Sequence, residues 1–86
     1  MALYDLVIEK TAERDLKKLT PEIADRITPH ITALSDEPRP AGCKKMAGAE
    51  NLWRIRVGDY RVIYGIDDPA LVIRVIRVRH RSRVYQ

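Results

Sequence analysis

Several features that mark other classes of protein are scarce or missing in this sequence. Cys43 is the only cysteine, so an internal disulfide and a zinc site with two or more cysteine ligands are excluded. No charged leader followed by an apolar stretch opens the chain, and no apolar run is long enough to span a bilayer. We therefore expect a cytoplasmic protein with no membrane partner. Phenylalanine is absent, so aliphatic side chains, tyrosines and Trp53 must fill the core.

The composition that remains is that of an ordinary globular domain. The chain has 86 residues, of which 45% are hydrophobic and 33% are charged, and this balance is typical of folded rather than disordered proteins. Its length suits one hydrophobic core, near the lower end of what folds alone. We expect residues 1–86 to form a single domain.

Positive charge is concentrated in the second half of the chain. Residues 1–40 carry six basic and eight acidic side chains, whereas residues 41–86 carry ten basic and four acidic ones. Eight of those ten basic residues are arginines, whose planar guanidinium groups bind phosphate through paired hydrogen bonds. The second half therefore has the composition of a surface that meets a polyanion.

The sequence of residues 1–40 predicts one strand and two helices. Residues 3–8 are apolar and partly alternating, which favours a short strand. Thr11 is expected to cap a helix that ends near Leu19, and Thr20 with Pro21 is typical of a second helix start. Pro29 is expected to bend this second helix near Thr28. Its buried stripe is predicted to comprise Ile23, Ile27, Ile31 and Leu34.

The second half predicts an antiparallel meander. Residues 52–57 and 60–66 alternate as strands around Gly58-Asp59, a two-residue turn that closes tight hairpins. Residues 71–78 form the last predicted strand. The fold class is therefore α+β, in the order β-α-α-β-β-β: an N-terminal strand, a helical hairpin and a meander.

The predicted hairpin gathers arginines on one face. Side chains alternate along a strand, so Arg54 and Arg56 share a face, and the two-residue turn places Arg56 opposite Arg61. Trp53 is then opposite Tyr64 on the apolar face. Like charges across a strand pair repel, and no acidic residue falls on either predicted strand. This pattern favours a phosphate-binding surface over a merely solvated one.

The basic tail that follows is harder to place. Alternation puts Arg77, Arg79 and Arg81 in one phase and Arg74, Val78 and His80 in the other. Strand geometry is not assured beyond Val78, so the pattern alone does not assign these side chains to faces.

Three segments resemble the RelE toxins of the RelE/ParE superfamily. They are residues 44–48 (KKMAG), 52–64 (LWRIRVGDYRVIY) and 78–85 (VRHRSRVY). The resemblance implies a RelE-like fold and a toxin held inactive in a hetero-oligomer with a cognate RelB-like antitoxin. When released, such toxins enter the ribosomal A site and cleave mRNA there. The ribose 2′-hydroxyl attacks its own 3′ phosphate, and the reaction needs no metal or other cofactor.

The resemblance also assigns roles to residues. The implied catalytic set is Arg61, Arg81, Tyr85 and His80, and the implied RNA-binding set is Arg54, Arg56, Lys44, Lys45 and Arg79. The family's C-terminal arginine falls on Arg81, or on Arg79 if the tail is aligned without a gap. Either Tyr85 or His80 is the general acid or base. Some relatives carry lysine at the positions of Arg54 and Arg56; a guanidinium stays protonated, so these two orient phosphate and do not act as bases.

Three other functions are compatible with the same residues. A ParE-like protein would share the fold and inhibit DNA gyrase, although such proteins generally lack the set of Arg61, His80-Arg81 and Tyr85. A plain RNA-binding module would use the same basic face without turnover. An inactive member of the family would not arrest growth when expressed.

Overall fold

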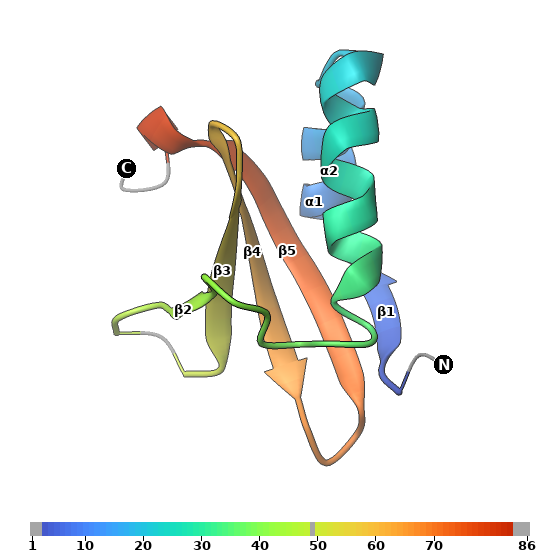
Figure 1. Ribbon diagram of the computed structural model, residues 1–86, viewed down its shortest axis with the longest axis vertical. Coiled ribbons are helices and arrows are strands. Elements are labelled where there is room, and N and C mark those ends of the chain that lie inside the picture. The colour runs from blue at the N-terminus through green and yellow to red at the C-terminus, as the bar shows by residue number, and fades with distance from the viewer. Residues whose placement is uncertain (1–2, 49, 84–86) are drawn as a thin grey trace.

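The computed structural model describes residues 3–48 and 50–83 and shows two helices on one face of a five-stranded sheet (Figure 1). The strand order across the sheet is β1-β5-β4-β3-β2. In chain order the elements are β1 (Asp5–Ile8), α1 (Lys10–Lys17), α2 (Pro21–Ala33), β2 (Lys44–Lys45), β3 (Leu52–Val57), β4 (Tyr60–Asp67), β5 (Val72–His80) and the 3₁₀ turn η1 (Arg81–Arg83). The predicted α+β class and element order are confirmed.

Two features of the sheet were not predicted. The short strand β2 pairs antiparallel with β3 and extends the sheet by one strand at its edge. At the opposite edge β1 pairs with β5 in parallel, so that Leu6 lies beside Ile73. The sheet is therefore mixed, with an antiparallel meander β3-β4-β5 between its two edge strands.

The second helix begins as predicted and the first does not. The Thr20 hydroxyl accepts a hydrogen bond from the Ile23 N–H at 3.3 Å, and Pro21 is the first helical residue. In α1 the N-cap is Glu9, so the expected capping role of Thr11 is wrong. The Thr11 hydroxyl instead donates to the carbonyl of Ile76 at 2.6 Å, which fastens α1 to β5.

Helix α2 continues through Pro29 to Ala33. A proline inside a helix costs about 3 kcal/mol, and burial of the apolar stripe opposes this cost. Ile27, Ile31 and Leu34 are buried as predicted, whereas Ile23 is half-buried at the edge of the core. The bend expected near Thr28 stays a prediction.

The hairpin register follows the prediction residue by residue. Val57 pairs with Tyr60, Arg56 with Arg61, and Trp53 with Tyr64. The face that carries Tyr64 packs against the helices in one core, to which α2, β3, β4 and β5 all contribute. The largest fully buried side chains are Tyr64, Ile27, Leu34, Ile73, Val62 and Val75.

A β-bulge in β5 changes the phase of its side chains. Ile63 pairs with Arg77 and Tyr64 pairs with Val75, so Ile76 is an extra residue on β5. Arg74 lies beside Gly65, on the face away from the helices, while Val78 is buried in the core. The grouping of Arg74 with Val78 and His80 by simple alternation is therefore wrong.

The bulged end of β5 is an edge of the sheet, because β1 ends opposite Val75. Asp15 of α1 covers this edge. Its carboxylate accepts hydrogen bonds from the Val78 N–H at 3.0 Å and from the Arg77 Nε at 2.9 Å. The Asp15 side chain is only 13% exposed. The contact joins α1 to the end of β5 that carries the predicted site residues.

Candidate functional site

At the hairpin end of the sheet face that the helices leave open lies a group of arginines that we call the arginine face: Arg54, Arg56, Arg61 and Arg79. Arg56, Arg61 and Arg79 form a row across β3, β4 and β5, because each is paired with the next in register. Arg54 lies two residues before Arg56 on the same side of β3, opposite Lys44 of β2. A hollow of about 180 Å³ is lined by Gly42, Lys44, Arg54, Arg56 and Arg61. The predicted phosphate-binding residues of β3 and β4 are thus brought together.

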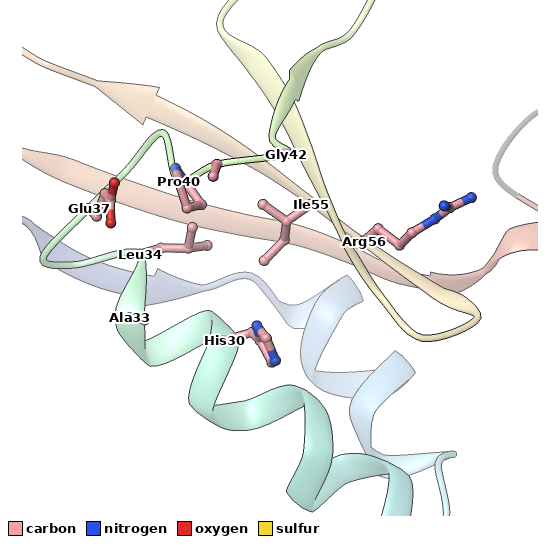
Figure 2. Close-up of a pocket in the computed structure, with 9 residues that line it drawn as sticks. His30, Ala33, Leu34, Glu37, Pro40, Gly42, Ile55 and Arg56 are labelled. Carbon is pink, nitrogen blue, oxygen red and sulfur yellow. The ribbon is translucent and has the colours of Figure 1, made fainter.

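The alternation of β3 separates this face from the core. Ile55 and Arg56 leave the strand in opposite directions, Ile55 toward Leu34 and Arg56 away from it (Figure 2). On β4, Ile63 shares the open face with Arg61, yet it is only 8% exposed. Ile63 is paired with Arg54 on one side and with Arg77 on the other. The aliphatic stems of these arginines can cover the Ile63 side chain, which accounts for its low exposure.

Arg61 is the most buried member of the arginine face, at 8% exposure. Its Nη1 donates to the carbonyl of Tyr60 at 3.1 Å and lies 3.5 Å from the carbonyl of Gly58. A cation held against turn carbonyls and partly removed from water acts more strongly on a nearby anion than an exposed one does. Arg61 is therefore fixed in position beside the hairpin turn.

Arg81 reaches the same turn from the end of β5. Its backbone N–H donates to the carbonyl of Asp59 at 2.7 Å, and its Nε lies 3.9 Å from the Asp59 carboxylate. Both side chains of this pair are well exposed, so the ion pair itself is weak. Arg61 and Arg81 are thus held at one turn, whereas Arg79 lies in the row next to Arg61; the structure brings both candidates for the C-terminal arginine to this end of the sheet.

His80 lies on the other side of the sheet from the arginine face. It pairs with Tyr60, and the two rings meet edge to face with centroids 5.4 Å apart. Its Nδ1 accepts from the Ser82 N–H at 3.3 Å and lies 3.0 Å from the Ser82 hydroxyl. Tyr60 packs on the helix-facing core. The structure therefore does not bring His80 together with Arg61 and Arg79.

Two further predicted residues are not part of the arginine face as described. Lys45 pairs with Trp53, whose side of β3 faces the helices, and it lines a separate hollow with Met46 and Gly48. Of the two adjacent lysines, only Lys44 joins the arginines. Tyr85 lies outside the described residues.

A pocket of about 450 Å³ lies on the helix side of β3 (Figure 2). The C-terminal turn of α2, the loop after it and β3 enclose this space. Among its walls are His30, Leu34, Pro40, Ile55 and Arg56. No residue pattern predicts this pocket, because its size depends on the distance between the loop and the strand.

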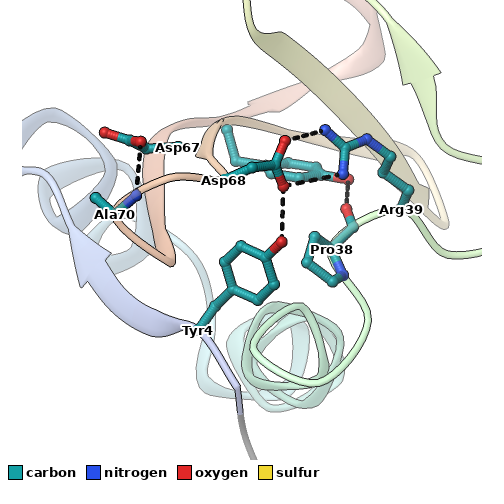
Figure 3. Close-up of polar contacts among 7 residues, drawn as sticks. Tyr4, Pro38, Arg39, Asp67, Asp68 and Ala70 are labelled. Atoms are coloured by element: carbon teal, nitrogen blue, oxygen red, sulfur yellow. Dashed lines mark hydrogen bonds and ion pairs between the residues drawn. The ribbon is translucent and has the colours of Figure 1, made fainter.

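A polar cluster that was not predicted from the sequence holds the opposite end of the sheet (Figure 3). Asp68 accepts from the Tyr4 hydroxyl at 2.7 Å and from Arg39 Nη2 at 2.9 Å. The Arg39 hydrogen bond, and then that of Tyr4, lowers the pKa of Asp68. The Arg39 guanidinium also lies over the Trp53 ring, 4.9 Å from its centroid. This cluster fastens the loop before β2 and so helps to place Lys44.

Buried Tyr64 secures the same loop. Its hydroxyl donates to the carbonyl of Pro38 at 2.7 Å. Burial raises the pKa of Tyr64, and the nearby Cys43 raises it further. Tyr64 therefore remains a neutral hydrogen-bond donor across the physiological pH range.

The described part of the chain offers cations rather than metal ligands. Within residues 3–48 and 50–83, no three His, Cys, Asp or Glu side chains are grouped so that they could hold a metal ion. Over the same residues, neither helix has the length and apolar character needed to cross a membrane.

Comparisons with known proteins agree with this fold. The family model described as the ParE toxin of the type II toxin–antitoxin system parDE matches residues 6–85. Toxin RelE of Mycobacterium tuberculosis is 34% identical over 84 residues, covering 96% of this chain and 87% of the relative. A chain of the archaeal RelE–RelB complex from Pyrococcus horikoshii has a TM-score of 0.81 and 30% identity, covering 95% of this chain and 99% of that one. A chain of the toxin–antitoxin complex RelBE2 from M. tuberculosis has a TM-score of 0.78 and 34% identity, covering 90% of this chain and 96% of that one.

Sequence and fold match over nearly the whole length, and this chain therefore belongs to the RelE/ParE family of type II toxin–antitoxin toxins.

Proposed function

We propose that this toxin is a cytoplasmic, metal-independent endoribonuclease that cleaves mRNA in the ribosomal A site. The observation that carries the proposal is the row of Arg56, Arg61 and Arg79 across three strands. Three cations side by side on the face that the helices leave open repel one another, and a phosphodiester chain relieves that repulsion. Positions 52–57 and 60–66 hold no acidic residue.

The reaction is an attack of the ribose 2′-oxygen on the adjacent phosphorus. The 2′-O–P bond forms and the P–O5′ bond breaks, while the 2′-hydroxyl loses its proton and the leaving 5′-oxygen gains one. The products are a 2′,3′-cyclic phosphate and a 5′-hydroxyl. Negative charge grows on the phosphorane oxygens, and fixed cations such as Arg61 and Arg81 stabilise it more in the transition state than in the ground state. Lys44, Arg54 and Arg56 orient the flanking phosphates.

The proton carrier is proposed to be Tyr85 in preference to His80. Positive charge near a phenol favours its ionised form, so more phenolate is available to accept a proton, and Tyr85 follows Arg79, Arg81 and Arg83 in the sequence. His80 lies beside Tyr60 on the opposite side of the sheet from Arg61. That position favours a role for His80 outside the reacting centre.

The proposed partner in the inactive state is a RelB-like antitoxin. The relatives from P. horikoshii and M. tuberculosis were solved as toxin–antitoxin complexes. A partly acidic helix of the antitoxin would cover the arginine face and offset its charge, or would displace the C-terminal residues. Hydrogen exchange of the co-purified complex tests this. Protection along β3 and β4 is expected, and a complex in which both strands exchange as in the free toxin would contradict it.

Primer extension on a defined mRNA, with and without programmed ribosomes, tests the activity. Wild type, Arg61→Ala and Tyr85→Phe are compared with Arg26→Ala, an exposed arginine of α2 that serves as a matched charge control. Cuts that need ribosomes, persist in Arg26→Ala and vanish in the other two variants are expected. Absence of cuts by wild type under both conditions would refute the proposal.

A second candidate is inhibition of DNA gyrase, because the family model that matches residues 6–85 describes the ParE toxin. The basic face would then bind DNA or an acidic surface of the gyrase complex. A supercoiling assay with purified gyrase separates the two functions. Inhibition of supercoiling by a toxin that leaves mRNA intact would favour this alternative.

A further inference from the structure

We infer that a second groove, next to the arginine face but on the helix side of the sheet, binds one nucleotide that flanks the cleaved linkage. This inference rests on the proposed RNA cleavage and adds a subsite to it. The groove has a volume of about 400 Å³ and lies where α1, β4, β5 and η1 meet. Its principal walls are Lys18, Leu19, Tyr60, Arg79, His80 and Ser82.

One wall of the groove is aromatic. The rings of Tyr60 and His80 stand at 89° to one another with centroids 5.4 Å apart, so together they form a corner rather than a flat stack. The Nδ1 of His80 accepts the Ser82 N–H, which fixes the ring and leaves the hydrogen of the neutral imidazole on Nε2. A base bound in this corner would stack against a ring and would also contact polar groups, which can distinguish one base from another.

The charge of the groove is positive. Asp15 is its one acidic wall among the residues that the structure describes, and its carboxylate is already occupied by Arg77 and the Val78 N–H. Lys18 is the C-cap of α1 and Arg79 ends the row across the sheet, so each brings a cation to the rim. Aromatic surface together with cations is the combination that binds single-stranded nucleic acid, whereas an acidic peptide would use the cations alone.

The sheet edge connects the groove to the arginine face. Strand β1 ends opposite Val75, and Thr11 and Asp15 of α1 contact the outer edge of β5 from Ile76 to Val78. Among the described residues, the edge that neither β1 nor these α1 contacts reach is therefore at Arg79 and His80. Arg79 is paired with Arg61 on the open face and also lines the groove. An RNA chain that leaves Arg61 can therefore pass around this edge and place its next nucleotide in the groove. The base at that position would influence which sites are cut.

Binding of short 2′-O-methyl oligonucleotides, which lack the attacking hydroxyl, tests the subsite by fluorescence anisotropy. A labelled dinucleotide is compared with trinucleotides extended on the 5′ or the 3′ side, and with the same trinucleotides carrying an abasic end. The variants are Lys18→Gln and Lys10→Gln, which remove the same charge from opposite ends of α1, and Arg56→Gln, which reports on the arginine face.

For wild type, extension on one side should raise affinity roughly tenfold, and the abasic end should lose most of this gain because stacking supplies it. Lys18→Gln should weaken that trinucleotide by about three- to fivefold and leave the dinucleotide unchanged. Lys10→Gln should behave as wild type. The subsite is overturned if Lys18→Gln and Lys10→Gln bind every oligonucleotide equally, or if Lys18→Gln loses affinity only for an acidic peptide such as hexaglutamate.

The outcome for Arg56→Gln separates this inference from the proposed function. If Arg56→Gln binds all oligonucleotides more weakly and Lys18→Gln has no effect, then RNA binds the arginine face and the proposed subsite does not exist. If Arg56→Gln binds the oligonucleotides as wild type does, the arginine face itself does not bind RNA.

Discussion

Asp15 should be the most important polar side chain of α1 for stability. Its carboxylate accepts three hydrogen bonds, from the Val78 N–H at 3.0 Å and from Arg77 Nε and Nη2 at 2.9 and 3.2 Å. The side chain is 13% exposed, and that of Arg77 is 35% exposed. Asp15→Ala leaves the backbone donor at the edge of β5 without its charged acceptor, and it leaves a half-buried guanidinium without its counter-ion.

The size of the effect follows from these contacts. A hydrogen bond to a charged group contributes about 1.5–3 kcal/mol, and the partly exposed ion pair adds less than about 1 kcal/mol. We expect Asp15→Ala to lower the free energy of unfolding by about 2–3 kcal/mol, which corresponds to roughly 10–20 °C in Tm for a domain of this size. Alanine is the better helix former, so the measured loss understates the contact. Asp15→Asn keeps an oxygen acceptor and should lose about half as much.

Urea denaturation followed by circular dichroism measures this change, with Glu13→Ala as the matched control. Glu13 forms the i,i+4 pair with Lys17 in the same helix at 3.3 Å, but both side chains are more than half exposed. Its loss should cost less than about 0.5 kcal/mol. Equal destabilisation by Asp15→Ala and Glu13→Ala would refute the reasoning from burial.

Three other predictions concern the site and the loop that supports it. Log affinity for single-stranded RNA falls linearly with log salt concentration, and Arg56→Gln should reduce the magnitude of that slope by about 0.7 because one phosphate contact is lost. Fluorescence anisotropy in a potassium chloride series measures the slope. An unchanged slope would contradict a phosphate contact. The pKa of Asp68 lies below its ordinary value of 3.8, so its contribution to stability is complete above that pH and is lost as pH falls through the lower folded value. The Tm curves of wild type and Asp68→Asn should therefore approach each other only as pH falls below 3.8. Parallel curves would show that the carboxylate has no such role. Tyr64→Phe should cost about 1 kcal/mol, because the Pro38 carbonyl loses its donor, and the slope of the urea transition should not change.

The parts of this fold that the sequence predicts are those determined by neighbours along the chain. Gly58-Asp59 is a two-residue turn, so it fixes every pair from Val57–Tyr60 outward, and the arginine row of β3 and β4 follows from it. Thr20-Pro21 fixes the start of α2 in the same local way. In both places the short-range preference agrees with the final packing.

The parts that were missed depend on partners far apart in the sequence. Periodicity does not reveal that Asp15 pairs with Arg77, or that Arg39 pairs with Asp68. The faces of the side chains at the end of β5 were left open because strand geometry was not assured beyond Val78. The strand in fact runs to His80, and the extra residue Ile76 reverses its phase. The adjacent position of Arg61 and Arg81 at one turn likewise arises from the tertiary fold, through the contact of Arg81 with Asp59.

The parallel pairing of β1 with β5 has a consequence for the order in which the molecule folds. Leu6 meets Ile73, 67 positions later in the chain, whereas β3 and β4 meet across two residues. Closing so long a loop costs more entropy than closing a tight turn, so the hairpin should form early and β1 should join last. A nascent chain must therefore hold Leu6, Val7 and Ile8 unpaired until β5 has been synthesised. During that interval its first strand is an exposed apolar segment, open to chaperones and to aggregation.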